Sequence, residues 1–106
     1  MPDISQPTAL SELDLDDVFY GLAESKPQVI YYDKLGKTVT LTASDMFTHS
    51  VVYTPAQAPF FCIENQSCST DAHNLYAQGL VDESHLLILD PGESMSSYVE
   101  IAVADL

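Results

Sequence analysis

The sequence predicts an all-β protein, most simply one built as an antiparallel β-sandwich. About six short segments are apolar or alternate between apolar and polar residues, and turn residues separate them. No long segment carries apolar residues at helical spacing, so long helices are not expected to contribute to the core. A chain of 106 residues is long enough for one core, which predicts a single domain over residues 1–106, with residues 1–12 as a loop or surface arm.

The clearest strand signal is a pair of segments at residues 28–33 and 38–43. The first is rich in β-branched and aromatic residues, and the second alternates threonine with apolar residues. Val39, Leu41 and Ala43 therefore share one face of the second strand, as in a half-buried antiparallel strand. The sequence predicts a β-hairpin that turns at residues 34–37.

Four more strands are expected, at residues 49–54, 59–65, 85–90 and 97–106. Pro55 ends the first of them, and Pro59 fits only at the start of the second. In the last strand Val99, Ile101 and Val103 share one face. Residues 70–80 hold one helical turn at most and are expected to form a long loop.

The charge is strongly negative, with 16 acidic residues, 3 lysines, no arginine and a formal net charge of −13. This field repels phosphate backbones and anionic lipids, which argues against nucleic acid and membrane partners. The lack of arginine removes the usual bidentate phosphate clamp. A neutral ligand is therefore expected.

Three features are missing from the sequence: a membrane-spanning run, a signal peptide and a metal-binding cysteine pattern. No apolar run has the length of a membrane span, and the N-terminal residues do not resemble a signal peptide, so a cytoplasmic location is expected by default. Cys62 and Cys68 have no metal-ligand pattern around them. We expect no metal or cofactor, no disulfide in a reducing compartment, and Cys62 as a small core residue.

Glu64 stands at the end of a segment that should be core. Alternation places Phe60, Cys62 and Glu64 on one face of the strand. A carboxylate beside an aromatic ring and a thiol is partly desolvated, which raises its proton affinity toward values useful for a general base. The alternative is that Glu64 lies at a sheet rim and caps the amides of residues 65–69.

Several segments together resemble the C-terminal third of the aldose 1-epimerase (galactose mutarotase) family. "LDDVFYGL" resembles that family's Asp-His-x-Phe element, with Asp17 in place of the histidine. The other matching motifs, in chain order, are Tyr53-Thr54, Cys62-Ile63-Glu64-Asn65-Gln66, Asp71-Ala72-His73-Asn74 and Leu89-Asp90-Pro91-Gly92-Glu93. Five such motifs in the order of the family are not expected by chance.

The resemblance implies part of a galactose-mutarotase-like supersandwich. It implies an isomerase of carbohydrate metabolism that interconverts the α and β anomers of free hexoses such as galactose or glucose by ring opening. Glu64 matches the family's general base, and Asp16 matches the carboxylate that binds sugar hydroxyls. Gln66, two residues beyond Glu64, is either a contact to the sugar or a loop-capping amide.

The sequence departs from the family pattern in its proton donor. The family carries an arginine and two histidines in an earlier part of the chain, whereas His49, His73 and His85 do not match them and are expected at the surface or rim. One carboxylate cannot serve both oxygens, so the chain alone should be nearly inactive. Either a missing N-terminal portion of the same fold or a homo-oligomer is expected to cover its exposed sheet edges.

Three alternatives stay open. The chain can be a non-catalytic carbohydrate-binding or assembly module derived from this fold, or a fragment without independent function. A hexose-6-phosphate epimerase is the nearest rival within the enzyme class, and the lack of arginine argues weakly against it.

Overall fold

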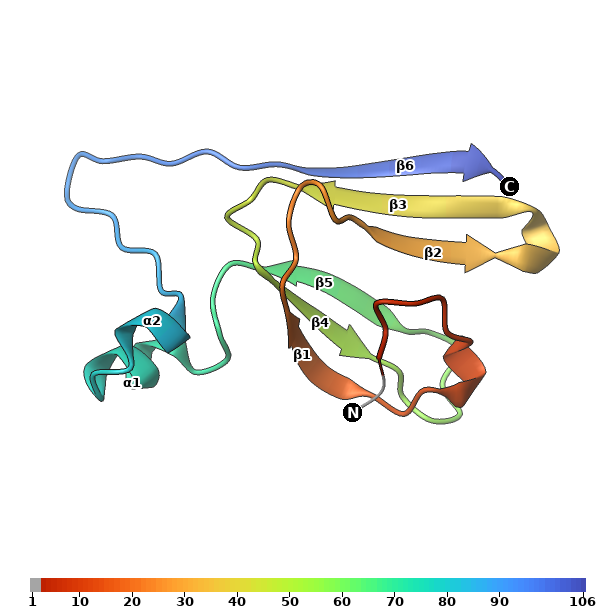
Figure 1. The fold of residues 1–106 in the computed structure, drawn as a ribbon, viewed down its shortest axis with the longest axis horizontal. Helices are drawn as coiled ribbons and strands as arrows, with labels where there is room; N and C mark the ends of the chain where they lie inside the picture. The colour runs from red at the N-terminus through yellow and green to blue at the C-terminus, as the bar shows by residue number, and fades with distance from the viewer. Residues whose placement is uncertain (1–2) are drawn as a thin grey trace.

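A computed structural model describes residues 3–106 as two three-stranded antiparallel sheets with two short helices (Figure 1). The prediction of an all-β, sandwich-like fold is confirmed. One sheet has the order β1-β4-β5 and the other the order β2-β3-β6. The strands are β1 (Asp16–Tyr20), β2 (Gln28–Tyr32), β3 (Lys37–Ala43), β4 (His49–Tyr53), β5 (Cys62–Gln66) and β6 (Val99–Asp105), and the helices are α1 (Ala72–Ala77) and α2 (Val81–Ser84).

The predicted hairpin is present as β2 and β3. Its connection is a 3₁₀ turn at Asp33–Leu35 followed by Gly36, whose φ of 64° lies in the left-handed region. Glycine adopts this conformation without the steric cost that a side chain adds. Lys37 belongs to β3 and pairs with Tyr32, so the turn covers residues 33–36 and has the predicted length, one residue earlier than predicted.

The last predicted strand is also present, as β6 at the edge of the β2-β3-β6 sheet. It pairs along its whole length with β3, with Val103 opposite Val39 and Ile101 opposite Leu41. Residues directly opposite one another in a sheet point to the same side. Val99, Ile101 and Val103 therefore continue the apolar face of β3, as the alternation predicts.

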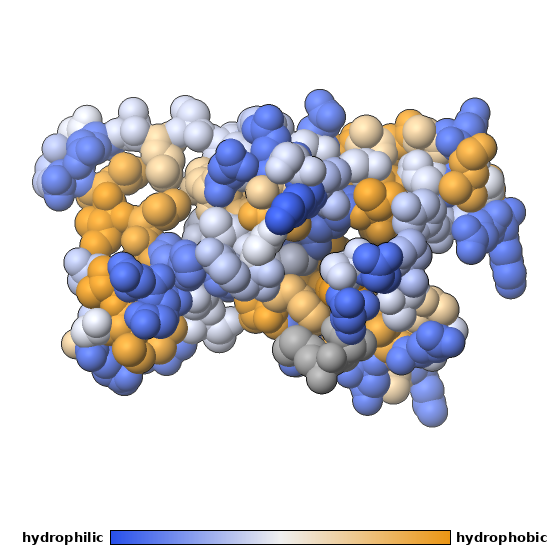
Figure 2. Space-filling view, viewed as in Figure 1, coloured by the Kyte–Doolittle hydropathy of each residue, from blue (hydrophilic) through white to orange (hydrophobic). Residues whose placement is uncertain are grey.

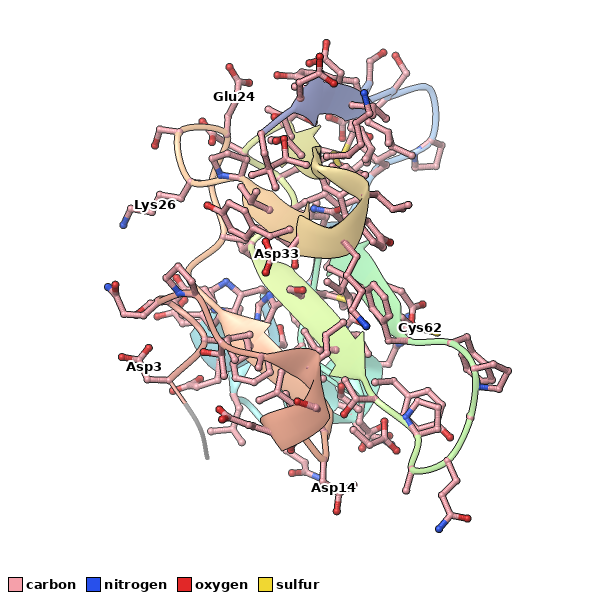
Figure 3. The ribbon with its side chains drawn as sticks, turned by 90° about the vertical axis from the view of Figure 1, so that its right-hand side faces the viewer. Asp3, Asp14, Glu24, Lys26, Asp33 and Cys62 are labelled. Carbon is pink, nitrogen blue, oxygen red and sulfur yellow. The ribbon has the colours of Figure 1, made fainter. Side chains whose placement is uncertain are left out.

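The two sheets face each other through a thin inner layer. Val52 of β4 and Ala43 of β3 are buried, and the hydroxyl of Ser50 on β4 donates a hydrogen bond to the side-chain oxygen of Gln28 on β2. This bond identifies the inner face of each sheet. Figure 3 shows the β2-β3-β6 sheet above the β1-β4-β5 sheet in an end-on view, with Cys62 on β5 in the lower sheet.

The core is small for a chain of this length. Among residues 3–106 the buried apolar residues are Leu15, Ala43, Val52 and Ala72, and two of these are alanines. The radius of gyration is 15.8 Å, whereas a compact domain of this length has one of about 13 Å. The sheets therefore overlap only in part and leave much apolar surface uncovered, which Figure 2 shows over the helical segment and at the right-hand end of the β2-β3-β6 sheet.

Two predicted strands differ from the structure. Residues 85–90 form no strand: His85 ends α2 with a φ of 52°, and the following residues are unpaired, with Leu87, Ile88 and Leu89 exposed. A short apolar run cannot become a strand without a neighbour to pair with. The strand predicted at residues 59–65 begins only at Cys62 and ends at Gln66, because the loop from β4 extends through Phe61.

Two further elements were not expected as such. Residues 70–80, predicted as a loop, contain helix α1. Asp71 takes a left-handed conformation before it, and the Asn74 amide donates to the Asp71 carboxylate at 2.7 Å. Residues 16–20, which the sequence marked only by resemblance, form strand β1.

No helix among residues 3–106 combines the length and the apolar character needed to cross a membrane.

Candidate functional site

The candidate site lies on the outer face of the β1-β4-β5 sheet, on the side opposite Ser50 and Val52. The register brings residues from three strands into three rows on this face. We call it the Glu64 face. Its rows are Asp16–Tyr53–Cys62, Val18–Val51–Glu64 and Tyr20–His49–Gln66.

All three predicted site residues lie on the Glu64 face. Asp16 comes from β1, and Glu64 and Gln66 come from β5, with β4 between the two strands. From standard strand spacings, the Cα atoms of Asp16 and Glu64 are about 12 Å apart. The two carboxylates are therefore not in contact, and the interval between them is wide enough for one sugar ring to contact both.

Glu64 is more exposed than the sequence predicts. Its neighbours on this face include Val51 directly opposite, and Cys62 shares the face as expected, but the Glu64 side chain is open to solvent. Phe60 precedes β5 and is not part of the strand as expected, but it packs edge-on against Tyr53 of the Glu64 face, with 6.3 Å between ring centroids. The expectation that Glu64 is partly desolvated is therefore wrong, because its side chain faces solvent.

Cys62 is not a core residue either. Its side chain is partly exposed at the start of β5, in the same row as Asp16 and Tyr53, and both cysteines are free thiols. The prediction that it fills the core is wrong, because β5 turns this side of its sheet outward. No group of three or more histidine, cysteine or acidic side chains within residues 3–106 is arranged to hold a metal ion.

Gln66 is held by its own loop. Its side-chain amide donates a hydrogen bond of 2.6 Å to the backbone carbonyl of Cys68. This is the loop-capping role that the sequence left open beside ligand contact. The side-chain oxygen is the atom that a ligand hydroxyl would meet.

Sequence reasoning missed a cluster of aromatic rings at one end of the Glu64 face. Tyr20, His49 and His85 form a triangle with centroid distances of 5.1, 4.9 and 5.0 Å. His49 is only 5% exposed, so the expectation that it lies at the rim is wrong. His85 reaches it from the end of α2, so the helical segment lies against this end of the face, where Tyr20 stays exposed.

His49 is held in one tautomer by its neighbours. The Ser69 hydroxyl donates to the backbone carbonyl of Glu83 at 2.6 Å, so His49 Nε2 donates to Ser69 Oγ at 3.3 Å. His49 Nδ1 then accepts from the Thr48 hydroxyl at 2.8 Å. Burial, together with the neighbouring His85, lowers the pKa of His49 below 6.5. The imidazole is therefore neutral near pH 7 and is a poor proton donor for the site.

His73 lies on exposed α1. The Asp71-Ala72-His73-Asn74 motif shapes the start of that helix, with Ala72 buried beneath it.

The motif at residues 89–93 has a structural role. Glu93 N donates to the carbonyl of Asp90, and Asp90 N donates to the Glu93 carboxylate, both at 3.0 Å. Pro91 and Gly92, the latter with a φ of 88°, stand at the central positions of this turn, as in a type II turn.

A cavity of about 550 Å³ adjoins the other end of the Glu64 face. Its lining includes Leu13, Asp14, Thr54, Phe60 and Phe61. None of the predicted site residues line it. The open part of the Glu64 face thus lies between this cavity and the histidine cluster.

Comparison of the chain with protein-family models, with curated proteins and with solved structures found no match in any of the three.

Proposed function

We propose that this chain carries the hexose-binding face and the general base of an aldose 1-epimerase, an isomerase that interconverts the α and β anomers of free hexoses such as galactose or glucose. The observation that carries the proposal is the sheet register. It brings Asp16 of β1 and Glu64 of β5 onto one outer face, about 12 Å apart. These are the two residues that the motif resemblance assigns to sugar binding and to proton abstraction.

In the proposed reaction the Glu64 carboxylate takes the proton of the C1 hydroxyl. The C1–O5 bond breaks, its electron pair goes to O5, and O5 receives a proton from an acid. The open-chain aldehyde rotates about C1–C2 and closes again with the proton transfers reversed. Asp16 holds the sugar by accepting charge-assisted hydrogen bonds from its hydroxyls. A bound sugar would also exclude water from the Glu64 carboxylate, which is how this exposed group would become a more effective base.

The acid is the missing component. His49 is the histidine on the strands of this face, and its neutral form and engaged ring nitrogens make it unsuitable. His85 comes from the end of α2 and lies against Tyr20 and His49, at the end of the face away from Asp16. We therefore propose that the acid comes from outside residues 3–106, from an N-terminal portion of the same fold. The 106-residue chain by itself would then accelerate the reaction only weakly.

The charge bears on the partners. With a net charge of −13 we propose a neutral sugar as ligand and no nucleic acid or membrane partner. We also propose a cytoplasmic location, because the sequence has neither a run of membrane-spanning length nor a segment like a signal peptide. No cofactor takes part in the proposed reaction.

Polarimetry tests the catalytic proposal. Freshly dissolved α-D-galactose should reach its equilibrium rotation faster with the wild-type chain than with buffer, and Glu64→Gln should abolish the difference. Glu24→Gln, an acidic residue in the β1-β2 connection, is the matched control and should behave as wild type. Equal rates for wild type and Glu64→Gln would contradict the role of Glu64 as base in this chain.

A non-catalytic carbohydrate-binding module is the second candidate. The exposure of Glu64 and the lack of a suitable acid on the face favour it. It predicts that galactose shifts the NMR signals of Asp16 and Glu64 without any acceleration of mutarotation. An unchanged NMR spectrum would contradict both candidates.

A further inference from the structure

Strand β6 exposes more apolar surface than a stable sheet edge normally does. All seven of its residues are exposed, and Ile101 and Val103 are each 68% exposed. β6 pairs with β3 on one side, and no strand within residues 3–106 pairs with its other edge (Figures 1 and 3). A long, exposed apolar edge strand is a template for another strand.

The backbone of β6 determines what can pair with it. Ser44 N donates to the Tyr98 carbonyl at 3.1 Å, and Leu106 N donates to the Gly36 carbonyl at 2.9 Å. Residues alternate along an antiparallel ladder, so the even-numbered residues of β6 direct their N–H and C=O groups toward β3. Val99, Ile101, Val103 and Asp105 therefore direct theirs outward, where a partner strand would satisfy them.

We propose that the partner is a second copy of this chain, paired antiparallel with β6 about a two-fold axis at Ile101. In this register Ile101 lies opposite Ile101 of the second copy, and Val99 lies opposite Val103 of the second copy. These residues are the ones with outward backbone groups, so about six hydrogen bonds form across the axis. The two sheets become one sheet of six strands.

The charges of β6 select this register. Glu100 lies opposite Ala102 of the second copy, and Asp105 lies opposite Ser97. Moving the axis to Glu100 would place two Glu100 carboxylates opposite each other, which is destabilising. Moving it to Ala102 would place Asp105 against Val99. The axis at Ile101 pairs Val99, Ile101 and Val103 with one another and leaves no like charges directly opposite.

In this register the branched apolar residues of β6 lie opposite the branched apolar residues of the second β6, as an isologous dimer requires. A two-fold axis perpendicular to the sheet keeps the apolar faces of both copies on the same side. Val99, Ile101 and Val103 from the two copies then pack beside one another and cover surface that each chain exposes alone. Of the two carboxylates of β6, Asp105 already forms an ion pair with Lys37, whereas Glu100 forms none with any residue from 3 to 106.

Sedimentation equilibrium of the full 106-residue chain tests the proposal. Each copy carries a net charge of −13, so the copies repel each other at long range. Raising NaCl from about 50 mM to about 500 mM should tighten the dimer several-fold, because the Debye length falls from about 14 Å to about 4 Å. A monomer at both salt concentrations, or a dimer that weakens with salt, would overturn the proposal.

A charge substitution tests the location of the interface. Ile101→Lys places two lysines opposite each other at the axis and should raise the dimer dissociation constant at least about tenfold. Val29→Lys is the matched control, since Val29 is an exposed branched residue on β2, the other edge strand of the same sheet. It adds the same charge and should leave the dimer intact. Equal weakening by both variants would overturn the assignment to β6.

Cross-linking tests the register. In a chain with Cys62→Ser and Cys68→Ser, Ile101→Cys places two thiols on a hydrogen-bonded pair with Cα atoms about 5.5 Å apart, within disulfide range. Copper phenanthroline should link this variant into a covalent dimer. Val103→Cys should not link, because its two copies lie about 14 Å apart along the strands. Linking of Val103→Cys as fast as Ile101→Cys, or of neither, would overturn the register. These outcomes are independent of sugar binding, since β6 belongs to the other sheet.

Discussion

The Thr54 side chain holds the segment before β1 in place, and its removal should destabilise the fold. Leu15 N donates to the Thr54 hydroxyl at 2.8 Å, and that hydroxyl donates to the Leu13 carbonyl at 3.2 Å. Thr54 is 8% exposed and Leu15 is 4% exposed, so the Leu15 N–H has little access to water that could replace the lost bond. Thr54→Val keeps the shape but leaves the Leu15 N–H buried without a partner, which costs about 1–3 kcal/mol. With the second bond also lost, we expect the free energy of unfolding to fall by about 2 kcal/mol.

Urea denaturation followed by circular dichroism measures this change. Thr40→Val is the matched control, because Thr40 lies on a partly exposed face of β3 and the new side chain is also β-branched. It should change the free energy of unfolding by less than about 0.5 kcal/mol. Since Leu15 directly precedes Asp16, Thr54→Val should also weaken galactose binding. A loss of stability no larger than that of the control would refute the reasoning that this hydroxyl clamps β1.

Three further predictions follow from the geometry. The pKa of His49 is lowered by burial and by His85, so the unfolded chain binds more protons below pH 6.5 than the folded chain does. The stability that neutral His49 provides is therefore present above pH 6.5 and is lost as the pH falls toward the pKa of His49 in the folded chain. The urea concentration at the midpoint of unfolding should therefore fall over this pH range. In His49→Gln this pH dependence of the midpoint should be smaller. Gly36→Ala should cost about 1 kcal/mol in urea denaturation, because φ is 64° there while no atom crowds a new Cβ. Asp16→Asn should raise the galactose dissociation constant about tenfold in an NMR titration, because a neutral amide loses the charge-assisted hydrogen bond; an unchanged constant would remove Asp16 from the site.

The β-strands with clear alternation were predictable from the sequence. Residues 38–43 and 97–106 have one apolar face each, and period two fixes which residues share it. Residues 85–90 were not predictable in this way, because an apolar run carries no information on whether a neighbouring strand exists. Helix α1 was missed because it has only six residues and follows Asp71, whose left-handed conformation the sequence does not indicate, and because the burial of Ala72 depends on tertiary packing.

The candidate site was predictable in part. The residue types and their order pointed to Asp16, Glu64 and Gln66, but only the register showed that they share a face, because β4 lies between their strands. The burial of His49 was hidden because His85, which covers it, comes from α2. The exposure of Glu64 could not be inferred from period two alone, since alternation defines two faces and does not say which one is inner.

The central claim is that the Glu64 face binds a hexose, and a titration of the isotope-labelled chain with D-galactose tests it most directly. We predict that the amide signals of Asp16, Glu64 and Gln66 shift together with one dissociation constant, and that Glu64→Gln weakens this response. Signals of β2, far from this face, should stay unchanged. Shifts confined to other strands, or none up to the solubility limit of the sugar, would contradict the account.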